Sequence, residues 1–347
     1  MFVIQDRKIG VLEKPFIIAE MSGNHNQSLS RALELVDAAA DAGADAVKLQ
    51  TYTADTLTLD VSNKQFVVSD KDSLWFGMSL YDLYSQASTP WEWHSQIIAH
   101  AAKRGLICFS SPFDATAVDF LENLNVGAYK IASAELIDLE LIRYVASKGK
   151  PIIISTGMAN IAEIHEAVAV CHSVGNHNIA LLQCTASYPA SPAHSNIMTI
   201  PNMREVFGCE VGLSDHTMGI GVAVGAVALG ATIVEKHFTL RRSDGGVDSA
   251  FSLEPKELEQ LVIETERVQI ALGNVVYAPA ESEMPGLMFR RSLYVSEDIR
   301  KGDIFSNSNV RSVRPGYGLL PKYLNIVLGR TAKCDLPKGT ALSFDHI

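Results

Sequence analysis

Residues 210–238 read EVGLSDHTMGIGVAVGAVALGATIVEKHF, and this stretch holds two short apolar runs joined by a segment rich in Gly and Ala. The runs Glu210–Leu213 and Thr232–Lys236 have the length and the β-branched content of strands that are buried on both faces. The uncharged stretch Thr217–Val234 predicts a buried helix that ends at Gly230, where glycine supplies a left-handed C-cap, followed by the second strand. Strand, helix and strand in this order predict a parallel βαβ unit.

The same alternation extends over most of the chain. Helical periodicity separates many of the other apolar runs, as in Leu29–Ala42 and Ile161–Val174. Eight strands over roughly 270 residues predict a closed (β/α)₈ TIM barrel, since that fold typically takes about 250 residues. An open doubly wound sheet is the alternative, but no GxGxxG pattern follows the first strand. The other six predicted strands are Phe16–Glu20, Ala46–Gln50, Leu106–Ser110, Ala128–Ile131, Pro151–Ser155 and Ile179–Gln183.

Composition changes after the last helical segment of the barrel. We expect a barrel domain over residues 1–276, a linker with two prolines over 277–289, and a small β-rich domain over 290–347. Within the last part, Asp298-Ile299-Arg300-Lys301-Gly302 recurs as Asp335-Leu336-Pro337-Lys338-Gly339, which predicts internal pseudo-symmetry. A domain of about 58 residues has a marginal core, so it is expected to pack on a barrel of the same or another subunit.

A long insertion, Leu57–Thr89, separates the second predicted strand from its helix. It contains Trp75, Tyr81 and Tyr84, and aromatic residues favour an ordered segment. Loops of this length with ordered structure are usually functional, so we expect a lid over the site.

Composition restricts the class of protein. Of the 347 residues, 47% are hydrophobic and 20% are charged, which is typical of a soluble globular protein. The net charge of −10 argues against nucleic acid or an anionic membrane as the main partner. Five scattered cysteines and a start without an apolar signal segment predict a reducing, cytoplasmic setting.

Nearly every predicted strand ends in side chains that can carry out chemistry. In a (β/α)₈ barrel the catalytic residues lie at the carboxyl ends of the strands, so we expect these groups to form one active-site face. They are Glu20, Lys48 with Gln50, Ser110 with Ser111, Lys130 with Ser133, Ser155 with Thr156, Gln183 with Thr185, Ser214-Asp215-His216 and Glu235-Lys236-His237.

Two histidines end neighbouring strands. His216 and His237 are expected about 5 Å apart, the spacing of adjacent strands. Two imidazoles at that separation can hold one divalent ion and leave positions open for substrate and water, whereas each alone would be an ordinary hydrogen-bonded histidine. The pair predicts a metal site.

Three lysines fall within predicted strands, where lysine is rare unless it is paired or functional. Lys236 alternates with its neighbours and is expected to point into the helical layer and make structural bonds. Lys48 and Lys130 are the candidates for a site, either for a bound phosphate or carboxylate or for a Schiff base. Hydroxyl groups of Ser133, Ser155 and Ser214 lie at a matching depth for a phosphate, or each is simply a helix cap or turn residue.

The carboxylates are less specific. Glu20 closes the first strand and faces the predicted mouth, where it can orient water or a sugar hydroxyl. Asp215 and Glu235 are expected to hold the histidines by hydrogen bonds. Asp248, after Gly245-Gly246, is a candidate for binding a polyol or merely a turn residue.

At this point the sequence resembles the sialic acid synthase family. The tail, with Arg291-Ser292-Leu293 and Arg314-Pro315-Gly316, is similar to the antifreeze-like (SAF) domain of that family. The motifs that carry the resemblance in the barrel are Ile18-Ala19-Glu20, Asn24-His25-Asn26, Val47–Thr51, Ser111-Pro112-Phe113, Tyr129–Ser133, Ser155–Met158, Cys184-Thr185, Tyr188-Pro189, Gly212–Thr217 and Glu235–Leu240.

Within the family, the chain is most similar to the pseudaminate branch. The similarity lies in and around the insertion, where substrate choice is expected to be made. Its motifs are Tyr52–Leu59, Leu80–Tyr84, Thr89–His94 and Cys108–Phe113.

The resemblance implies condensation of phosphoenolpyruvate with an amino-sugar aldehyde to give a nine-carbon nonulosonic acid and phosphate. It implies a divalent ion on His216 and His237, with Mn²⁺ first and Mg²⁺ or Co²⁺ as alternatives, and Glu20 or Glu235 as the group that takes a proton from water. The positions implied for phosphoenolpyruvate are Glu20, Lys48, Lys130, Ser133, Ser155 and Ser214.

The resemblance also implies sugar contacts. Gln50, Tyr188 and Asp248 match positions that reach the sugar, and Arg314 from the tail of a partner subunit would complete the pocket in a domain-swapped homodimer. The family position before Tyr188 that can be Asn is Ala186 here, so the resemblance does not carry that contact.

Three alternatives remain open. An N-acetylneuraminate or legionaminate synthase differs only in the sugar. A Schiff-base aldolase would use Lys48 or Lys130 and would not need a metal. A non-catalytic carbohydrate-binding protein would never release phosphate.

Overall fold

The computed structural model describes residues 2–71 and 73–347. The chain divides into two compact units, Met1–Gly273 and Asn274–Ile347. Within the described ranges, none of the helices combines the length and the apolar character needed to cross a membrane.

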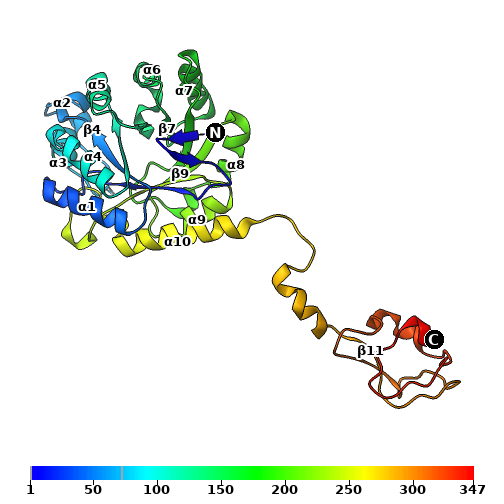
Figure 1. The fold of residues 1–347 in the computed structure, drawn as a ribbon. Helices are drawn as coiled ribbons and strands as arrows, with labels where there is room; N and C mark the ends of the chain where they lie inside the picture. The colour runs from blue at the N-terminus through cyan, green and yellow to red at the C-terminus, as the bar shows by residue number, and fades with distance from the viewer. Residues whose placement is uncertain (1, 72) are drawn as a thin grey trace. The chain divides into compact units, whose positions relative to one another are not determined.

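The first unit is a closed barrel of parallel strands, which confirms the TIM-barrel prediction (Figure 1). The strands pair in chain order, and β10 closes the ring on β3 with His237 opposite Glu20. The strands of the barrel are β3 (Phe16–Glu20), β4 (Ala46–Thr51), β5 (Ile107–Pro112), β6 (Tyr129–Ile131), β7 (Ile152–Ser155), β8 (Ile179–Cys184), β9 (Glu210–Asp215) and β10 (Ile233–His237).

A helix follows each strand and covers the outside of the barrel (Figure 1). Side chains before the helices supply the caps that the sequence pattern favours: Asp114 accepts from the amides of Thr116 and Ala117, and Asn160 forms a capping box with Glu163. The helices are α1 (Leu29–Asp41), α4 (His94–Lys103), α5 (Ala115–Asn123), α6 (Leu139–Ser147), α7 (Ile161–Ser173), α8 (Thr199–Phe207), α9 (Gly221–Ala228) and α10 (Pro255–Leu272).

A short hairpin that the sequence pattern did not predict precedes the barrel. Strands β1 (Phe2–Ile4) and β2 (Arg7–Ile9) are antiparallel. Their apolar side chains join the core inside the barrel, together with Phe16 and Ile233 from the first and last barrel strands. The hairpin therefore packs against the end of the barrel opposite the carboxyl ends of the strands.

The insertion, Leu57–Thr89, contains the short elements η1 (Lys64–Phe66) and α3 (Leu80–Ala87). The elements α2 (Ala54–Leu57) and η2 (Trp91–Trp93) flank it. Between η1 and α3, Val67 bridges Ser79 and the amide of Gly77 donates to the carbonyl of Val68, so the chain doubles back on itself. Trp75 lies in this turn.

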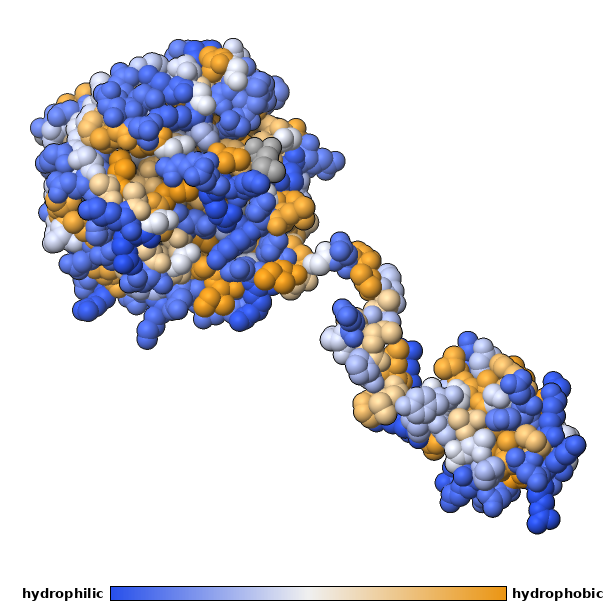
Figure 2. All heavy atoms as spheres, viewed as in Figure 1, coloured by the Kyte–Doolittle hydropathy of each residue, from blue (hydrophilic) through white to orange (hydrophobic). Residues whose placement is uncertain are grey.

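The second unit begins with an exposed segment. In that segment η7 (Glu281–Phe289) follows Val275 and Tyr277, whose side chains are fully or nearly fully exposed. Figure 2 shows apolar residues along this stretch. The predicted linker, 277–289, lies within it.

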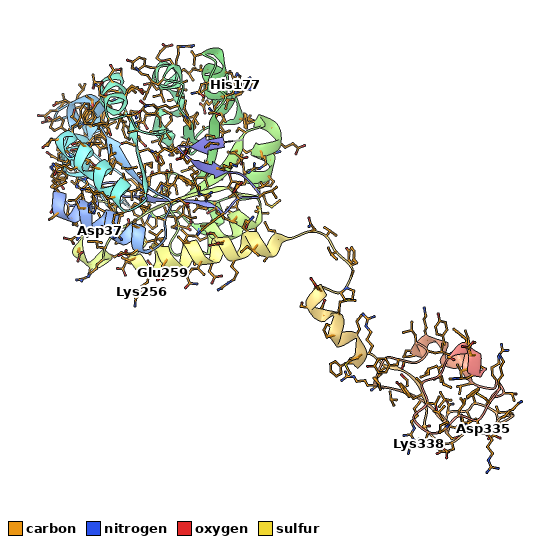
Figure 3. The ribbon with its side chains drawn as sticks, viewed as in Figure 1. Asp37, His177, Lys256, Glu259, Asp335 and Lys338 are labelled. Atoms are coloured by element: carbon orange, nitrogen blue, oxygen red, sulfur yellow. The ribbon has the colours of Figure 1, made fainter. Side chains whose placement is uncertain are left out.

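A small core closes the rest of the second unit. The predicted repeat is a structural pseudo-symmetry: Ile299 and Leu336 exchange two backbone hydrogen bonds, and the carboxylates of Asp298 and Asp335 accept from the amides of Lys338 and Lys301. Figure 3 labels Asp335 and Lys338 of the second copy. The regular elements are β11 (Ser292–Val295), β12 (Val310–Val313), η8 (Pro321–Tyr323), α11 (Leu324–Val327) and η9 (Phe344–His346).

Candidate active site

Four charged side chains are buried in the mouth of the barrel. Glu20 ends β3, Lys48 lies in β4, Lys130 in β6 and Glu235 in β10, and each is at most 5% exposed. Buried charges require partners, and here two cations face two carboxylates. The strand-end prediction is thus met by a compact ionic cluster.

Both lysines approach the same carboxylate. Lys48 Nζ lies 2.7 Å from Glu20 Oε2 and 3.9 Å from Glu235 Oε1, and Lys130 Nζ lies 3.5 Å from Glu235 Oε1. The two ammonium groups are therefore held near each other, an arrangement that suits one multiply charged anion.

The cluster divides into groups of different proton affinity. Burial raises the pKa of Glu20, against the opposing effect of Lys48. Burial also acts to raise the pKa of Glu235, but Lys130 and Lys48 outweigh it and lower that pKa. Burial opposes the charge of Lys48, yet Glu20 and Glu235 outweigh burial and raise its pKa, whereas burial lowers the pKa of Lys130. Glu235 is thus the permanent anion and Glu20 the carboxylate that can exchange a proton.

Hydroxyl groups surround the lysines at the depth predicted from the sequence. Lys130 Nζ donates to Ser155 Oγ at 2.7 Å, and Ser214 Oγ donates to Glu235 Oε1 at 3.2 Å. Lys48 Nζ donates to Ser111 Oγ at 3.3 Å. The structure therefore brings Ser155 and Ser214 into the cluster and adds Ser111, which the sequence analysis placed at a strand end without a role.

Ser133 lies beside this cluster in a separate set of bonds. Its Oγ accepts from the amide of Gly157 at 3.2 Å and donates to Cys184 Sγ at 3.4 Å. Cys184 in turn lies 3.9 Å from His216 Nδ1. Ser133 and Cys184 thus connect the region of the lysines to that of the histidines.

The two histidine rings are close together, as predicted. The ring centroids of His216 and His237 are 5.3 Å apart. His216 Nδ1 donates to the carbonyl of Thr185 at 2.9 Å, so in the neutral ring Nε2 carries the lone pair. Tyr188 and Phe251 pack on both rings.

The protonation of His237 suits ligation of a cation. Burial acts to lower the pKa of His216, but Cys184, Thr185 and Glu235 outweigh burial and raise that pKa. Burial, His216 and Lys48 hold the pKa of His237 well below its ordinary value, so His237 is neutral near pH 7. Its Nδ1 is buried without a hydrogen-bond partner among the residues described, and Asp248 Oδ2 lies 3.6 Å away. In the same described part of the chain, no three His, Cys, Asp or Glu residues are grouped to hold an ion by themselves. Two imidazoles therefore fit a metal that takes its other ligands from substrate and water.

The expectation that Asp215 and Glu235 hold the histidines is wrong. Asp215 points outward and binds Lys236, whose Nζ lies 2.9 Å from Asp215 Oδ2 and donates to the carbonyls of Thr217 and Gly219. Glu235 forms ion pairs with Lys48 and Lys130 instead. The prediction that Lys236 has a structural role in the helical layer is confirmed.

A cavity of about 410 Å³ opens beside His237. Its polar lining includes Gln50, Tyr188 and Asp248, the three barrel residues predicted to reach a sugar. Gln50 Nε2 donates to Glu20 Oε1 at 2.9 Å and to Ser22 Oγ at 3.2 Å, and Ser22 donates to Asp248. One chain of hydrogen bonds thus joins the cavity wall to the ionic cluster.

The cavity also contains groups that the sequence analysis did not single out. Glu135, in η3 (Ser133–Ile137), lines the cavity with an Oε2 that has no hydrogen-bond partner in the described ranges, and burial raises its pKa. It lies two residues past Ser133, so extending the strand-end rule into the following turn would have found it. Ser22 lies two residues past Glu20 in the same way.

Arg314 belongs to the second unit. It follows β12 and is joined to Pro315 by a cis peptide bond. Its place in a pocket therefore remains a prediction from resemblance.

Comparison with known proteins follows the same division of the chain. The NeuB family matches residues 35–277, and the SAF domain matches residues 290–347. A pseudaminic acid synthase from Campylobacter jejuni subsp. jejuni (strain 81-176) is 44% identical over 330 residues, which covers 95% of this chain and 96% of that protein. A pseudaminic acid synthase from Helicobacter pylori is 41% identical over 339 residues, or 97% and 99% of the two chains.

A solved structure shows the same fold. The N-acetylneuraminic acid (sialic acid) synthetase of Leptospira borgpetersenii, in complex with citrate, superposes with a TM-score of 0.73 at 33% identity. The match covers 82% of this chain and 94% of that chain.

Proposed function

The chain belongs to the NeuB family, and from that premise we propose that it is a pseudaminic acid synthase. It would condense phosphoenolpyruvate with 2,4-diacetamido-2,4,6-trideoxy-β-L-altropyranose and water to give pseudaminic acid and phosphate. The observation that carries the proposal is the pair of buried ammonium groups of Lys48 and Lys130 in a barrel mouth that also holds the His216–His237 pair, with a cavity beside His237. The high identity to named pseudaminic acid synthases supports the choice of sugar.

Phosphoenolpyruvate is held by the lysines. It carries close to three negative charges, and the two ammonium groups with the hydroxyls of Ser155, Ser214 and Ser133 offer charge-assisted donors for its phosphate and carboxylate. Glu235 remains ionised between the lysines and fixes both of them.

The aldehyde of the open-chain sugar is placed at the histidines. A divalent ion there, Mn²⁺ with Mg²⁺ or Co²⁺ as alternatives, would polarise the aldehyde carbonyl and orient the sugar. His216 is kept in position by the carbonyl of Thr185, and Gln50, Tyr188 and Asp248 face the remainder of the sugar from the cavity wall.

Bond formation and bond cleavage then take place between the two subsites. C3 of phosphoenolpyruvate attacks the aldehyde carbon, which leaves oxocarbenium character at C2. Water adds at C2, and phosphate leaves by cleavage of the C2–O bond. Glu20 takes the proton of that water, because its raised pKa and its position next to Lys48 suit a base better than the permanently ionised Glu235.

The second unit completes the site from a partner subunit in a domain-swapped homodimer. Residues 290–347 carry ten Lys and Arg against five Asp and Glu, a net +5, whereas the other residues carry 19 against 34, a net −15. Opposite net charges favour docking of this tail on a barrel, and the exposed apolar residues of the joining segment offer surface to bury. Arg314 would then reach the anionic substrates.

The domain limits proposed are a catalytic barrel over 1–276, a linker over 277–289 and a SAF domain over 290–347. We also propose a cytoplasmic location. The five cysteines are all free in the structure, which fits a reducing compartment.

Phosphate release tests the proposed function. Metal-reconstituted protein is given phosphoenolpyruvate with either the diacetamido-trideoxy-altrose or N-acetylmannosamine, each with and without EDTA. EDTA-sensitive release with the altrose alone supports the proposal. Release with N-acetylmannosamine alone assigns the chain to the neuraminate branch, and a borohydride-trapped adduct that forms despite EDTA indicates the Schiff-base aldolase.

A further inference from the structure

Trp75 of the insertion lies between two cavities. It lines the 410 Å³ cavity beside His237 and also a second cavity of about 540 Å³, as do Leu83 and Val247. Trp75 therefore borders open space in both cavities. Packing alone cannot fix a side chain in such a place.

One hydrogen bond holds the indole. Trp75 Nε1 donates to the carbonyl of Val247 at 2.9 Å, and the ring lies 5.8 Å from that of Tyr188, between centroids. This bond ties the insertion to the loop that follows β10. Tyr188 itself packs on His216.

The loop that accepts this bond is anchored to the barrel. Asn26 Nδ2 donates to the carbonyl of Gly245, and Ser22 donates to Asp248. Gly246 has a φ of +129°, and any side chain there would collide with Asn26. The Trp75–Val247 bond thus joins the long insertion to an anchored loop that carries a sugar-facing carboxylate.

The insertion supplies an apolar wall to the cavity. Besides Trp75, the residues of the insertion that line the cavity are Leu57, Val68, Leu80, Leu83, Tyr84 and Ala87. The five aliphatic members of this wall accept methyl groups but offer no partner for a hydroxyl, and Tyr84 adds one phenol group.

We propose that Trp75 is a specificity-determining residue that holds the insertion over the sugar. The apolar wall of the insertion then selects a 6-deoxy, diacetamido sugar over the same sugar with a 6-hydroxyl. The inference rests on the proposed function and deepens it. The methyl group at C6 and the acetyl methyls bury apolar surface against the wall, whereas a hydroxyl at C6 loses its water without a replacement. Such discrimination is worth roughly a hundredfold in kcat/KM.

The test compares two altroses that differ only at C6. Phosphate release is measured with 2,4-diacetamido-2,4,6-trideoxy-altrose and with its 6-hydroxy analogue, for the wild type, Trp75→Phe, Trp75→Ala and Phe76→Ala. Phe76 is the matched control, because it is the adjacent aromatic residue, is exposed and lines neither cavity. We expect Trp75→Ala to lower the preference for the 6-deoxy sugar at least tenfold while KM for phosphoenolpyruvate stays within about twofold.

Trp75→Phe separates the hydrogen bond from the ring. It keeps an aromatic surface but loses the N–H, so the preference should fall by roughly two- to tenfold. Phe76→Ala should leave the preference unchanged. An unchanged preference in Trp75→Ala, whatever its overall rate, would overturn the inference and leave the proposed function standing.

A binding measurement covers the case in which Trp75→Ala fails to fold. Wild-type protein labelled with 5-fluorotryptophan is titrated with the trideoxy sugar, and its ¹⁹F resonances are assigned by their absence from Trp75→Phe. The Trp75 resonance should shift with the sugar and not with phosphoenolpyruvate alone; no shift with the sugar refutes the inference. Wild-type protein that releases no phosphate with either altrose refutes the proposed function and this inference with it.

Discussion

Replacing Glu20 by Gln removes one negative charge from the buried cluster and keeps the shape of the side chain. The two lysines and two carboxylates sum to zero charge, so the variant leaves the cluster at +1. Lys48 loses its partner at 2.7 Å but keeps Glu235 at 3.9 Å and Ser111. A more positive cluster attracts the phosphoenolpyruvate anion at least as well as before.

The expected effect therefore differs between the two steps. A lost general base lowers kcat by about 10²–10⁴-fold, or ~3–5 kcal/mol of transition-state stabilisation. Binding of phosphoenolpyruvate should remain within about threefold of the wild type or become tighter, since the charge change favours the anion. Because Glu20 acts as a base with a raised pKa, activity falls as the pH is lowered through that pKa, and this acid limb should vanish from the Glu20→Gln profile.

The assay pairs steady-state phosphate release over a range of pH with calorimetric binding of phosphoenolpyruvate. Glu235→Gln is the matched control, because it makes the same change of charge in the same cluster but leaves Glu20 in place. It should keep the acid limb. Equal losses of kcat and of phosphoenolpyruvate affinity in Glu20→Gln, or an acid limb that persists there, would refute the assignment of the base.

Three further predictions concern the tail, the metal and the buried histidines. Mixing Lys130→Ala and Arg314→Ala proteins, each inactive alone, should restore about a quarter of the wild-type activity after subunit exchange. About half of the dimers are then heterodimers, and a domain-swapped heterodimer has one intact site in two. Activity that stays absent in verified heterodimers excludes the swap. Removal of the metal by EDTA should abolish phosphate release while calorimetry still detects phosphoenolpyruvate, which the lysines hold; loss of that binding would contradict the division of the site. His25 and His94 are buried with pKa values of about 4, burial being the main cause, so the unfolded chain binds more protons than the folded one between about pH 6.5 and 4. Stability should therefore fall by up to ~3 kcal/mol for each histidine as the pH is lowered through that window, and urea titrations at pH 7 and 4.5 with equal midpoints would disprove it.

The barrel could be predicted because its strands are buried on both faces. Such strands give continuous apolar runs, and β3 begins and ends at the residues that the pattern indicated. Alternation also separated Lys236 from its neighbours Glu235 and His237. The same rule applied to Asp215 would have turned it outward, toward Lys236, and would have avoided the wrong expectation that it supports a histidine.

Other features leave too little signal in the sequence. Strands β1 and β2 have three residues each, which is too short for a period-two pattern to stand out. Glu135 lies in a turn, where strand periodicity no longer applies. The contact of Trp75 with Val247 joins residues far apart in the chain, so neither local propensity nor spacing could place it.

Closure of the barrel has a consequence for synthesis of the protein. The ring is completed when Ile233 of β10 pairs with Phe16 of β3. During synthesis β3 therefore lacks one neighbouring strand until β10 has left the ribosome. Until then β3 and β9 each present an unpaired parallel edge, and the hairpin at the start of the chain has only part of its core to pack against. Nascent chains that stall within α9 are thus the aggregation-prone species, and slow codons placed there should increase the demand for chaperones.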